Sequence, residues 1–438
     1  MKKLKNSLES YFKLKALGSD LRTECMAGVT TFLTMAYILL VNPSILGSVG
    51  MNPGAAFVAT CLATAFGCLL MALMTNYPIA VAPSMALNTY FAYVIVQGLG
   101  YSWQSALGIV FLSGVLFLLM TLLGARQWVI RAIPESLHIA ICAGIGLFIA
   151  MLALKSAGII VASPQTLLTL GPVTSMPAIL FLVGFCLIVG LDHLRVPGAI
   201  MIGILVTTLL GLLTHETSFH GFIASPPSLE STWMQFDTKG LWEGQGPAII
   251  FSFFLVALFD GAGTLVGVLQ NHSFKQDPER SKKMTRALAA DSMATVAGAV
   301  LGTSTMAPYI ESSSGIRAGG RSGLTSLVVG GLFIIALFFS PLANTIPSFA
   351  TAPALLFVAS LMIKSLVHID WENLTECVPS VITFLMIPFS FSIADGIGLG
   401  FISYCLIKLF CGRVKDLNPM LVVLTGVFVV YFIYRPQV

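Results

Sequence analysis

Long apolar runs recur along the chain from Ala27 to the C-terminus, and short polar segments separate them. An α-helix needs about 20 apolar residues to cross the ~30 Å hydrocarbon core of a membrane. The pattern predicts about 14 membrane-spanning helices, near residues 27–46, 55–74, 80–97, 104–123, 136–155, 177–194, 197–213, 247–269, 287–302, 304–318, 322–341, 350–367, 378–393 and 395–412. An apolar run over 419–434 has no counterpart earlier in the chain, so we expect it to be an added final helix.

The composition agrees with an all-α polytopic membrane protein and leaves no room for a soluble domain. Of the 438 residues, 56% are hydrophobic and 10% are charged, and the mean hydropathy is +0.91. An ordinary soluble domain carries about 25% charged residues. The eight cysteines form no CxxC motif and no cluster with histidine, so we expect neither a metal site nor a cofactor.

The basic residues of the loops predict the topology. With the basic segment 1–26 in the cytoplasm, every second loop is basic, as the positive-inside rule requires. The long loop 214–246 is then extracytoplasmic and the loop from Lys275 to Arg286 is cytoplasmic. Residues 1–26 show no signal-peptide cleavage site and can form an amphipathic helix on the membrane surface. We therefore expect a multi-pass protein of the inner (cytoplasmic) membrane.

The two halves of the chain resemble each other. IPESLHIAICAGIGLFIAMLALKSAG (133–158) is similar to IPSFATAPALLFVASLMIKSLVH (346–368) at the opening Ile-Pro and the closing Lys-Ser. An Ala-Thr-x-x-Gly motif ends at Gly67 in one half and at Gly298 in the other. These matches keep the same order, and seven spans precede the long outer loop. We therefore predict a 7+7 inverted repeat, which is a transporter architecture.

Two corresponding segments are too short and too interrupted to be ordinary spans. They are NYPIAVAPSMALNTYFAYVIV (76–96), with Pro83, and GTSTMAPYIESSSGIRAGGRSG (302–323), with Pro308. Proline removes a backbone donor and disfavours the α region for the residue before it, so each segment should be extended up to its proline and helical afterwards. Paired half-helices of this kind indicate a substrate site near the bilayer midplane.

Three polar residues in or near these segments are candidates for the site. Asp260 is the single acid of the apolar stretch VALFDGAGTLVGV (256–268), and Glu311 and Asn88 follow the two prolines. A charged group at the bilayer centre costs about 2.5–3.5 kcal/mol on insertion scales, so a carboxylate there usually faces a cavity. The structural alternatives are a helix cap or ion pair for the acids and a helix–helix hydrogen bond for Asn88.

These residues resemble the azaguanine-type branch of the nucleobase cation symporters, the hypoxanthine/guanine and adenine permeases. The resemblance covers nearly the whole chain and is carried by AGVTTFLTMAYILLVNPSIL (27–46), APSMALNTYFAY (82–93), FDGAGTLVGV (259–268), GTSTMAPYIESSSGIRAGGRSGLT (302–325) and ATAPALLFV (350–358). It implies the uracil-permease fold, in which a core domain carries the substrate and moves against a gate domain. The core would comprise 27–123 and 247–341, and the gate 124–213 and 342–438. By motif match, the family's functional residues fall on Asp260, Glu311 and Asn88.

The chemistry of a purine fits these residue types. A neutral purine offers a flat π surface and an edge of N–H donors beside N and O acceptors. Asp260 and Glu311 can accept from N–H groups, and Asn88 can both donate and accept. The backbone N–H groups around Ser84 to Leu87 and around Ala307 to Ile310 can donate. The rings that can stack on the base are those of Phe259, Tyr90 and Tyr309.

We therefore expect proton-coupled import of purine nucleobases by alternating access, with hypoxanthine and guanine preferred over adenine. Either Asp260 or Glu311 can carry the proton, because burial penalises the charged form of a carboxyl group. The alternatives are a transporter of the same fold for uracil, xanthine or another small solute, and an intramembrane aspartyl protease using Asp260 with a second acid. The expected partners are a purine nucleobase, a proton and membrane lipid; a homodimer remains open, and we expect no nucleic acid.

Overall fold

The computed structural model describes residues 9–124, 133–163, 167–196, 198–219, 221–242, 246–269, 279–390 and 392–434. The α-helices are α2 (Leu21–Met35), α3 (Ile38–Gly47), α4 (Pro53–Thr75), α5 (Met85–Thr89), α6 (Trp103–Leu122), α8 (Glu135–Ser156), α9 (Met176–His193), α10 (Ala199–Leu213), α11 (Gly246–Leu269), α13 (Arg280–Leu301), α14 (Ser312–Arg317), α15 (Gly323–Ala336), α16 (Ser340–Thr345), α17 (Ser348–Ile363), α18 (Leu374–Phe389), α19 (Ile393–Phe410) and α20 (Pro419–Tyr434). The strands are β1 (Val81–Pro83), β2 (Ile160–Ser163), β3 (Leu167–Leu170) and β4 (Met306–Pro308). The prediction of a helical, polytopic chain is confirmed.

Eight helical stretches within the described residues are long and apolar enough to cross a membrane, and four shorter helices are also apolar. The first span, Leu21–Gly47, is one crossing with a tightened turn at Ala36 and Tyr37, where α2 meets α3. The backbone N–H of Leu39 donates to Ala36 there, which is an i to i−3 bond in place of the α-helical i to i−4 bond. This turn sets the position of Tyr37, which immediately precedes α3.

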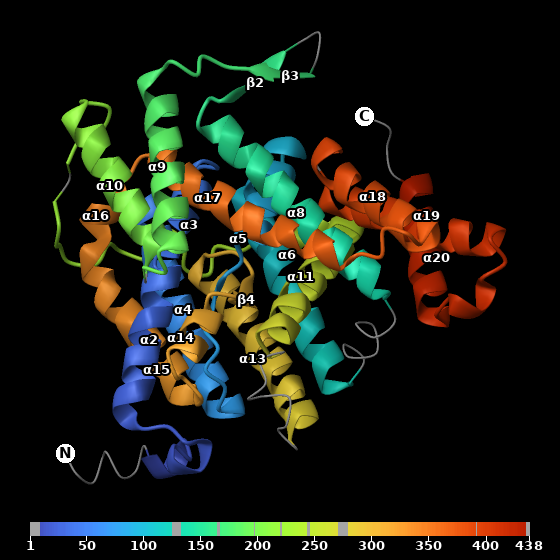
Figure 1. Cartoon of the computed structure of the whole chain (residues 1–438), viewed down its shortest axis with the longest axis horizontal. Coiled ribbons are helices and arrows are strands. Elements are labelled where there is room, and N and C mark those ends of the chain that lie inside the picture. Colours follow the sequence, from blue (N-terminus) through green and yellow to red (C-terminus); the bar gives the residue numbers. More distant parts are fainter. Residues whose placement is uncertain are drawn as a thin grey trace.

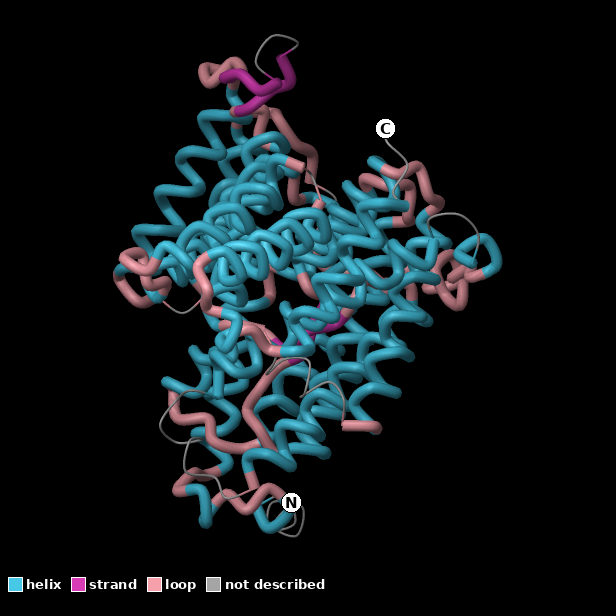
Figure 2. Tube along the Cα trace, turned by 90° about the vertical axis from the view of Figure 1, so that its right-hand side faces the viewer, coloured by secondary structure: helices cyan, strands magenta, loops and turns pink. Residues whose placement is uncertain are grey.

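The two interrupted segments cross each other. As the prolines predict, each segment is extended up to its proline and helical after it, with α5 beginning two residues after Pro83 and α14 four residues after Pro308. The extended parts pair as the antiparallel strands β1 and β4, with Val81 opposite Pro308. Figure 2 shows this short pair in magenta, enclosed by helices, whereas the β2–β3 hairpin projects from the molecule. The sequence predicted the extended conformation, but it did not predict the pairing of the strands or the hairpin.

Two glycines bring these strands close to their supporting helices. A Cβ on Gly67 of α4 would lie 3.0 Å from a Val81 side-chain atom, and one on Gly298 of α13 would lie 3.2 Å from the Ser304 carbonyl oxygen. Helix α4 precedes β1 and helix α13 precedes β4, so in both halves the Ala-Thr-x-x-Gly motif lies on the helix that packs against the following extended segment. A small residue at such a contact permits close backbone approach. The two glycines thereby allow each extended segment to lie close to the helix that precedes it.

The helices pack in two sets (Figure 1). In one set α4 packs against α13 and α15, α2 packs against α15, and α6 packs against α13. In the other set α8 packs against α17 and α18, and α9 packs against α10 and α17. Helix α11 contacts members of both sets, α6 and α8. The expected core and gate domains and their residue boundaries stay a prediction.

Candidate functional site

The first half-helix meets the acid of α11. Pro83 ends β1, and the extended backbone of Ser84 lets its Oγ cap α5 by accepting from the Leu87 N–H at 3.3 Å. The same hydroxyl donates to Oδ2 of Asp260 at 2.6 Å. Asp260 is partly exposed, so one carboxylate on an apolar helix faces the tip of the half-helix. The two residues are 176 positions apart in the chain, and the structure brings these two candidates together; their role in a site stays a prediction.

The second half-helix carries Glu311, which meets a residue that the sequence analysis did not select. Glu311 lies directly before α14, and its Oε1 accepts a hydrogen bond from the Tyr37 hydroxyl at 2.8 Å. Tyr37 is buried at the junction of α2 and α3. A tyrosine inside an apolar run has the sequence signature of a core residue, so only its partner, 274 positions away, reveals its polar role.

Asn88 is buried, and its side-chain amide has no hydrogen-bond partner among the described residues. It lies one turn beyond Ser84 on α5, and its backbone N–H donates to the Ser84 carbonyl at 2.8 Å. Within the described part of the chain, neither Nδ2 nor Oδ1 of Asn88 is paired. Asn42, by contrast, donates from Nδ2 to Thr60 and Thr303. Asn42 is therefore the asparagine that links helices, and Asn88 lacks that structural role.

The aromatic candidates are already packed against the protein. The Tyr309 hydroxyl donates to the Pro83 carbonyl, and the Tyr309 N–H donates to Ala80 at 2.9 Å, so Tyr309 ties the two crossing segments together. The Tyr90 ring lies 5.9 Å from the Phe253 ring of α11, measured between centroids. The Phe259 side chain lies outside the described part of the structure. Stacking of a base on these rings stays a prediction.

Tyr309 also places the two acids in the same region. It interacts electrostatically with both Glu311 and Asp260. The neighbouring Ile310 is 56% exposed, although it lies between the buried Tyr309 and the partly exposed Glu311. An exposed apolar side chain beside a carboxylate borders an accessible surface, as a binding site requires. A further acid, Asp291 of α13, interacts electrostatically with Asp260 and is buried; the sequence analysis missed it.

Two other acids, the buried Glu24 and the partly exposed Glu376, provide a comparison. Glu24 accepts from the backbone N–H groups of Arg321 and Ser322 and from the Thr325 hydroxyl. Glu376 accepts from hydroxyl groups on α8 and α19 and pairs with Lys408 at 2.6 Å. These carboxylates have the multiple partners expected of structural acids. Among the described residues, Asp260 and Glu311 each have one side-chain hydroxyl partner, Glu311 has a further bond with its own backbone, and both carboxylates retain acceptor capacity.

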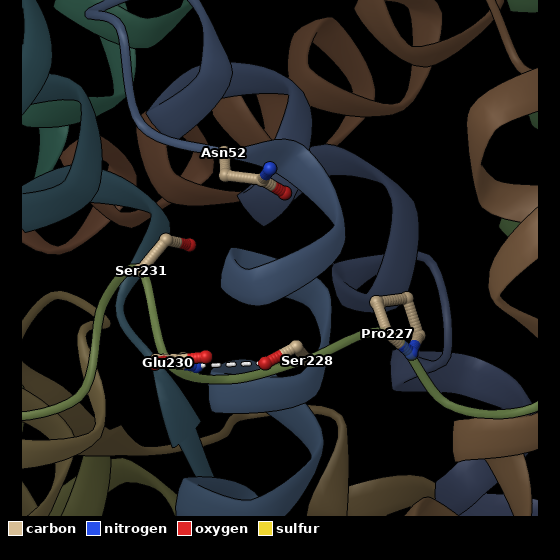
Figure 3. Close-up of a pocket in the computed structure, with 5 residues that line it drawn as sticks. All are labelled: Asn52, Pro227, Ser228, Glu230 and Ser231. Atoms are coloured by element: carbon tan, nitrogen blue, oxygen red, sulfur yellow. Dashed lines mark hydrogen bonds between the residues drawn. The ribbon is translucent and has the colours of Figure 1, made fainter.

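A separate cavity lies at the surface, away from these acids (Figure 3). It has a volume of about 380 Å³ and lies between the N-terminal end of α4 and the long loop 214–246. The residues that line it are Asn52, Pro227, Ser228, Glu230 and Ser231. The Asn52 side chain caps α4, and the Ser228 hydroxyl accepts from the Glu230 N–H, so these polar groups stabilise local structure. The cavity is lined by none of the predicted site residues.

The protein is helical and polytopic, its two half-helices meet through paired strands, and acids lie where they meet. This combination defines the class of membrane transporters. Its sequence defines the group further. The chain belongs to the xanthine/uracil permease family, because the family model described as "Permease family" (Xan_ur_permease) matches residues 22–399.

Similar proteins support this assignment. The chain is 45% identical to the adenine permease AdeP of Escherichia coli over 427 residues, which cover 98% of this chain and 96% of AdeP. It is 42% identical to the guanine/hypoxanthine permease PbuG of Bacillus subtilis over 441 residues, which cover 98% of this chain and 100% of PbuG. The transmembrane domain of the cyanobacterial bicarbonate transporter BicA has the same fold, with a TM-score of 0.66 at 14% identity, covering 86% of this chain and 97% of that one.

Proposed function

We propose that this permease imports purine nucleobases together with protons across the cytoplasmic membrane, by alternating access of a core domain against a gate domain. The observation that carries the proposal is the pairing of each half-helix with one incompletely bonded carboxylate, Asp260 through Ser84 and Glu311 beside α14. The relatives named as adenine and guanine/hypoxanthine permeases support purines as the substrate class.

In the proposed complex, Glu311 accepts from a ring N–H of the base, and Asp260 accepts from a second ring or exocyclic N–H. Asn88 supplies a donor and an acceptor that no described residue pairs with. A buried amide without a partner costs free energy, and a base that bonds to it removes that cost. A purine presents complementary groups along one edge, so one small ligand can satisfy all three side chains.

Proton coupling follows from the charge of the same carboxylates. Moving a charged group through a low-dielectric region is costly, so a core domain carrying Asp260 and Glu311 moves more readily when one of the two acids is protonated. The Ser84 hydroxyl stabilises ionised Asp260 by donating to it at 2.6 Å. Protonated Asp260 would instead act as a donor, which links the proton to the hydrogen bonds that the base can form.

For the preferred base we propose hypoxanthine and guanine over adenine. A 6-oxo purine carries an N1–H donor for a carboxylate, and adenine lacks it. The family relatives include permeases for both kinds of base, so the preference rests on this complementarity alone.

The test is uptake of radiolabelled nucleobases by cells that lack their own purine permeases and express this protein. Purines should accumulate, an uncoupler should abolish the accumulation, and unlabelled hypoxanthine should compete better than adenine. Uptake that requires sodium and persists without a proton gradient would contradict proton coupling. The absence of uptake for every purine, with the protein present in the membrane, would contradict the proposed substrate class.

A further inference from the structure

Tyr37 is a buried polar residue outside the predicted site that touches one of its acids. Its side chain is 1% exposed, and its hydroxyl donates to Oε1 of Glu311 at 2.8 Å. Tyr37 precedes α3, whereas Glu311 precedes α14. The contact therefore joins the first span to the second half-helix.

The surroundings of Tyr37 hold its hydroxyl in one place. Helix α3 packs against α4, α5 and β1, so it is part of the scaffold around both crossing segments. Five residues beyond Tyr37, the Asn42 amide donates to Thr303 at 2.9 Å. Residues 303 and 311 lie on either side of β4 in the second crossing segment, so Tyr37 and α3 together contact that segment before and after its strand. A phenol positioned in this way can orient a flexible glutamate side chain.

We propose that Tyr37 is a positioning residue for the base: it fixes the Glu311 carboxylate so that a ring N–H meets an acceptor that is already oriented. This inference rests on the proposed function. A hydroxyl bonded to Oε1 restricts the rotamers of Glu311 and leaves the lone pairs of Oε2 for a ligand. Without the hydroxyl, binding has to order that side chain, which corresponds to about a two- to tenfold loss of affinity.

The chain offers a matched control for this contact. Tyr404 of α19 is also buried, at 3% exposure, and its hydroxyl donates to Oε1 of Glu376 at 3.0 Å. Both tyrosines therefore bond a glutamate, but Glu376 is one of the multiply bonded acids and lies outside the proposed site. Replacing either tyrosine by phenylalanine keeps the ring and removes one hydroxyl.

The experiment compares Tyr37→Phe, Tyr404→Phe, Glu311→Gln and the double variant Tyr37→Phe/Glu311→Gln. Hypoxanthine binding is measured on the purified proteins, KM and Vmax are measured in cells, and thermal stability is measured without base. We expect Tyr37→Phe to weaken binding about two- to tenfold and to raise KM with Vmax kept. Tyr404→Phe should keep the wild-type affinity. The double variant should bind as Glu311→Gln does, because Tyr37 acts through Glu311.

Wild-type affinity in Tyr37→Phe, or an equal loss in Tyr404→Phe, would overturn the proposal. So would a further loss of affinity in the double variant. If Glu311→Gln binds too weakly to measure, the thermal stabilities decide, because independent effects of the two substitutions would show that the side chains are not coupled. A wild-type protein that binds no purine would instead refute the proposed function, while the stability measurements would still report the contact.

Discussion

Replacing Asn88 by leucine should stabilise the protein while impairing transport, which is the reverse of the usual effect of a core substitution. Asn88 is fully buried, and both polar atoms of its amide lack a partner among the described residues. An unpaired buried polar group costs about 1–3 kcal/mol, and leucine has a similar branched shape without polar atoms. We therefore expect Asn88→Leu to raise the free energy of unfolding without base by about 1–3 kcal/mol.

The control is Asn42→Leu. Asn42 is also fully buried, but its Nδ2 donates to Thr60 at 2.7 Å and to Thr303 at 2.9 Å. Removing these bonds should destabilise the protein by about 1–3 kcal/mol. The Oδ1 atom of Asn42 also lacks a partner among the described residues, so the two variants differ by the two hydrogen bonds that Nδ2 of Asn42 makes and Nδ2 of Asn88 does not.

The assay is thermal or denaturant unfolding of the purified protein, with and without hypoxanthine, together with uptake in cells. A base at about 100 times its Kd should stabilise the wild type by about 2.7 kcal/mol. In Asn88→Leu that gain should shrink and KM should rise. If Asn88→Leu loses as much stability as Asn42→Leu, or transports hypoxanthine like the wild type, the unpaired amide is not a substrate group.

Three further predictions follow from the site and the topology. Glu311→Gln loses a charge-assisted bond to a ring N–H and should weaken base binding about ten- to a hundredfold, measured by direct binding. Asp260→Asn should reach the membrane but fail to accumulate purine against a gradient, so accumulation at the wild-type level would remove Asp260 from the coupling mechanism. A cysteine introduced at Glu230 should react with an impermeant reagent from outside the cell and one at Lys282 should not, and the opposite labelling would refute the inverted topology.

Much of the fold could be predicted because its signals are local. Apolar runs of membrane-spanning length identify the helices, and Pro83 and Pro308 identify where two segments change from extended to helical. The pairing of β1 with β4 was not predictable in the same way. The paired residues are more than 200 positions apart, and three-residue strands carry no register signal in their sequence. That pairing is set by the helices that enclose it.

The site was predicted as far as residue chemistry reveals it. An isolated acid in an apolar helix is conspicuous, so Asp260 was selected, whereas its hydrogen bond with Ser84 is seen only in the structure. Tyr37 was not found because tyrosine is ordinary in a membrane core. Tyr309 was predicted as a stacking surface, but its hydroxyl and its N–H bond the first crossing segment. Whether a polar residue serves the fold or a ligand depends on partners that only the tertiary structure supplies.

The number of hydrogen-bond partners distinguishes Glu24 and Glu376 from Asp260 and Glu311. Glu24 accepts three hydrogen bonds at the start of α15, and Glu376 is bonded by two hydroxyls and a lysine. A carboxylate bonded in this way has few lone pairs left to accept from a ligand. Among the described residues, Asp260 and Glu311 each accept a hydrogen bond from one side-chain hydroxyl. Both acids lie near the point where the two interrupted segments pair. A carboxylate that binds a base and a proton needs lone pairs that the protein leaves available, and these two acids have them.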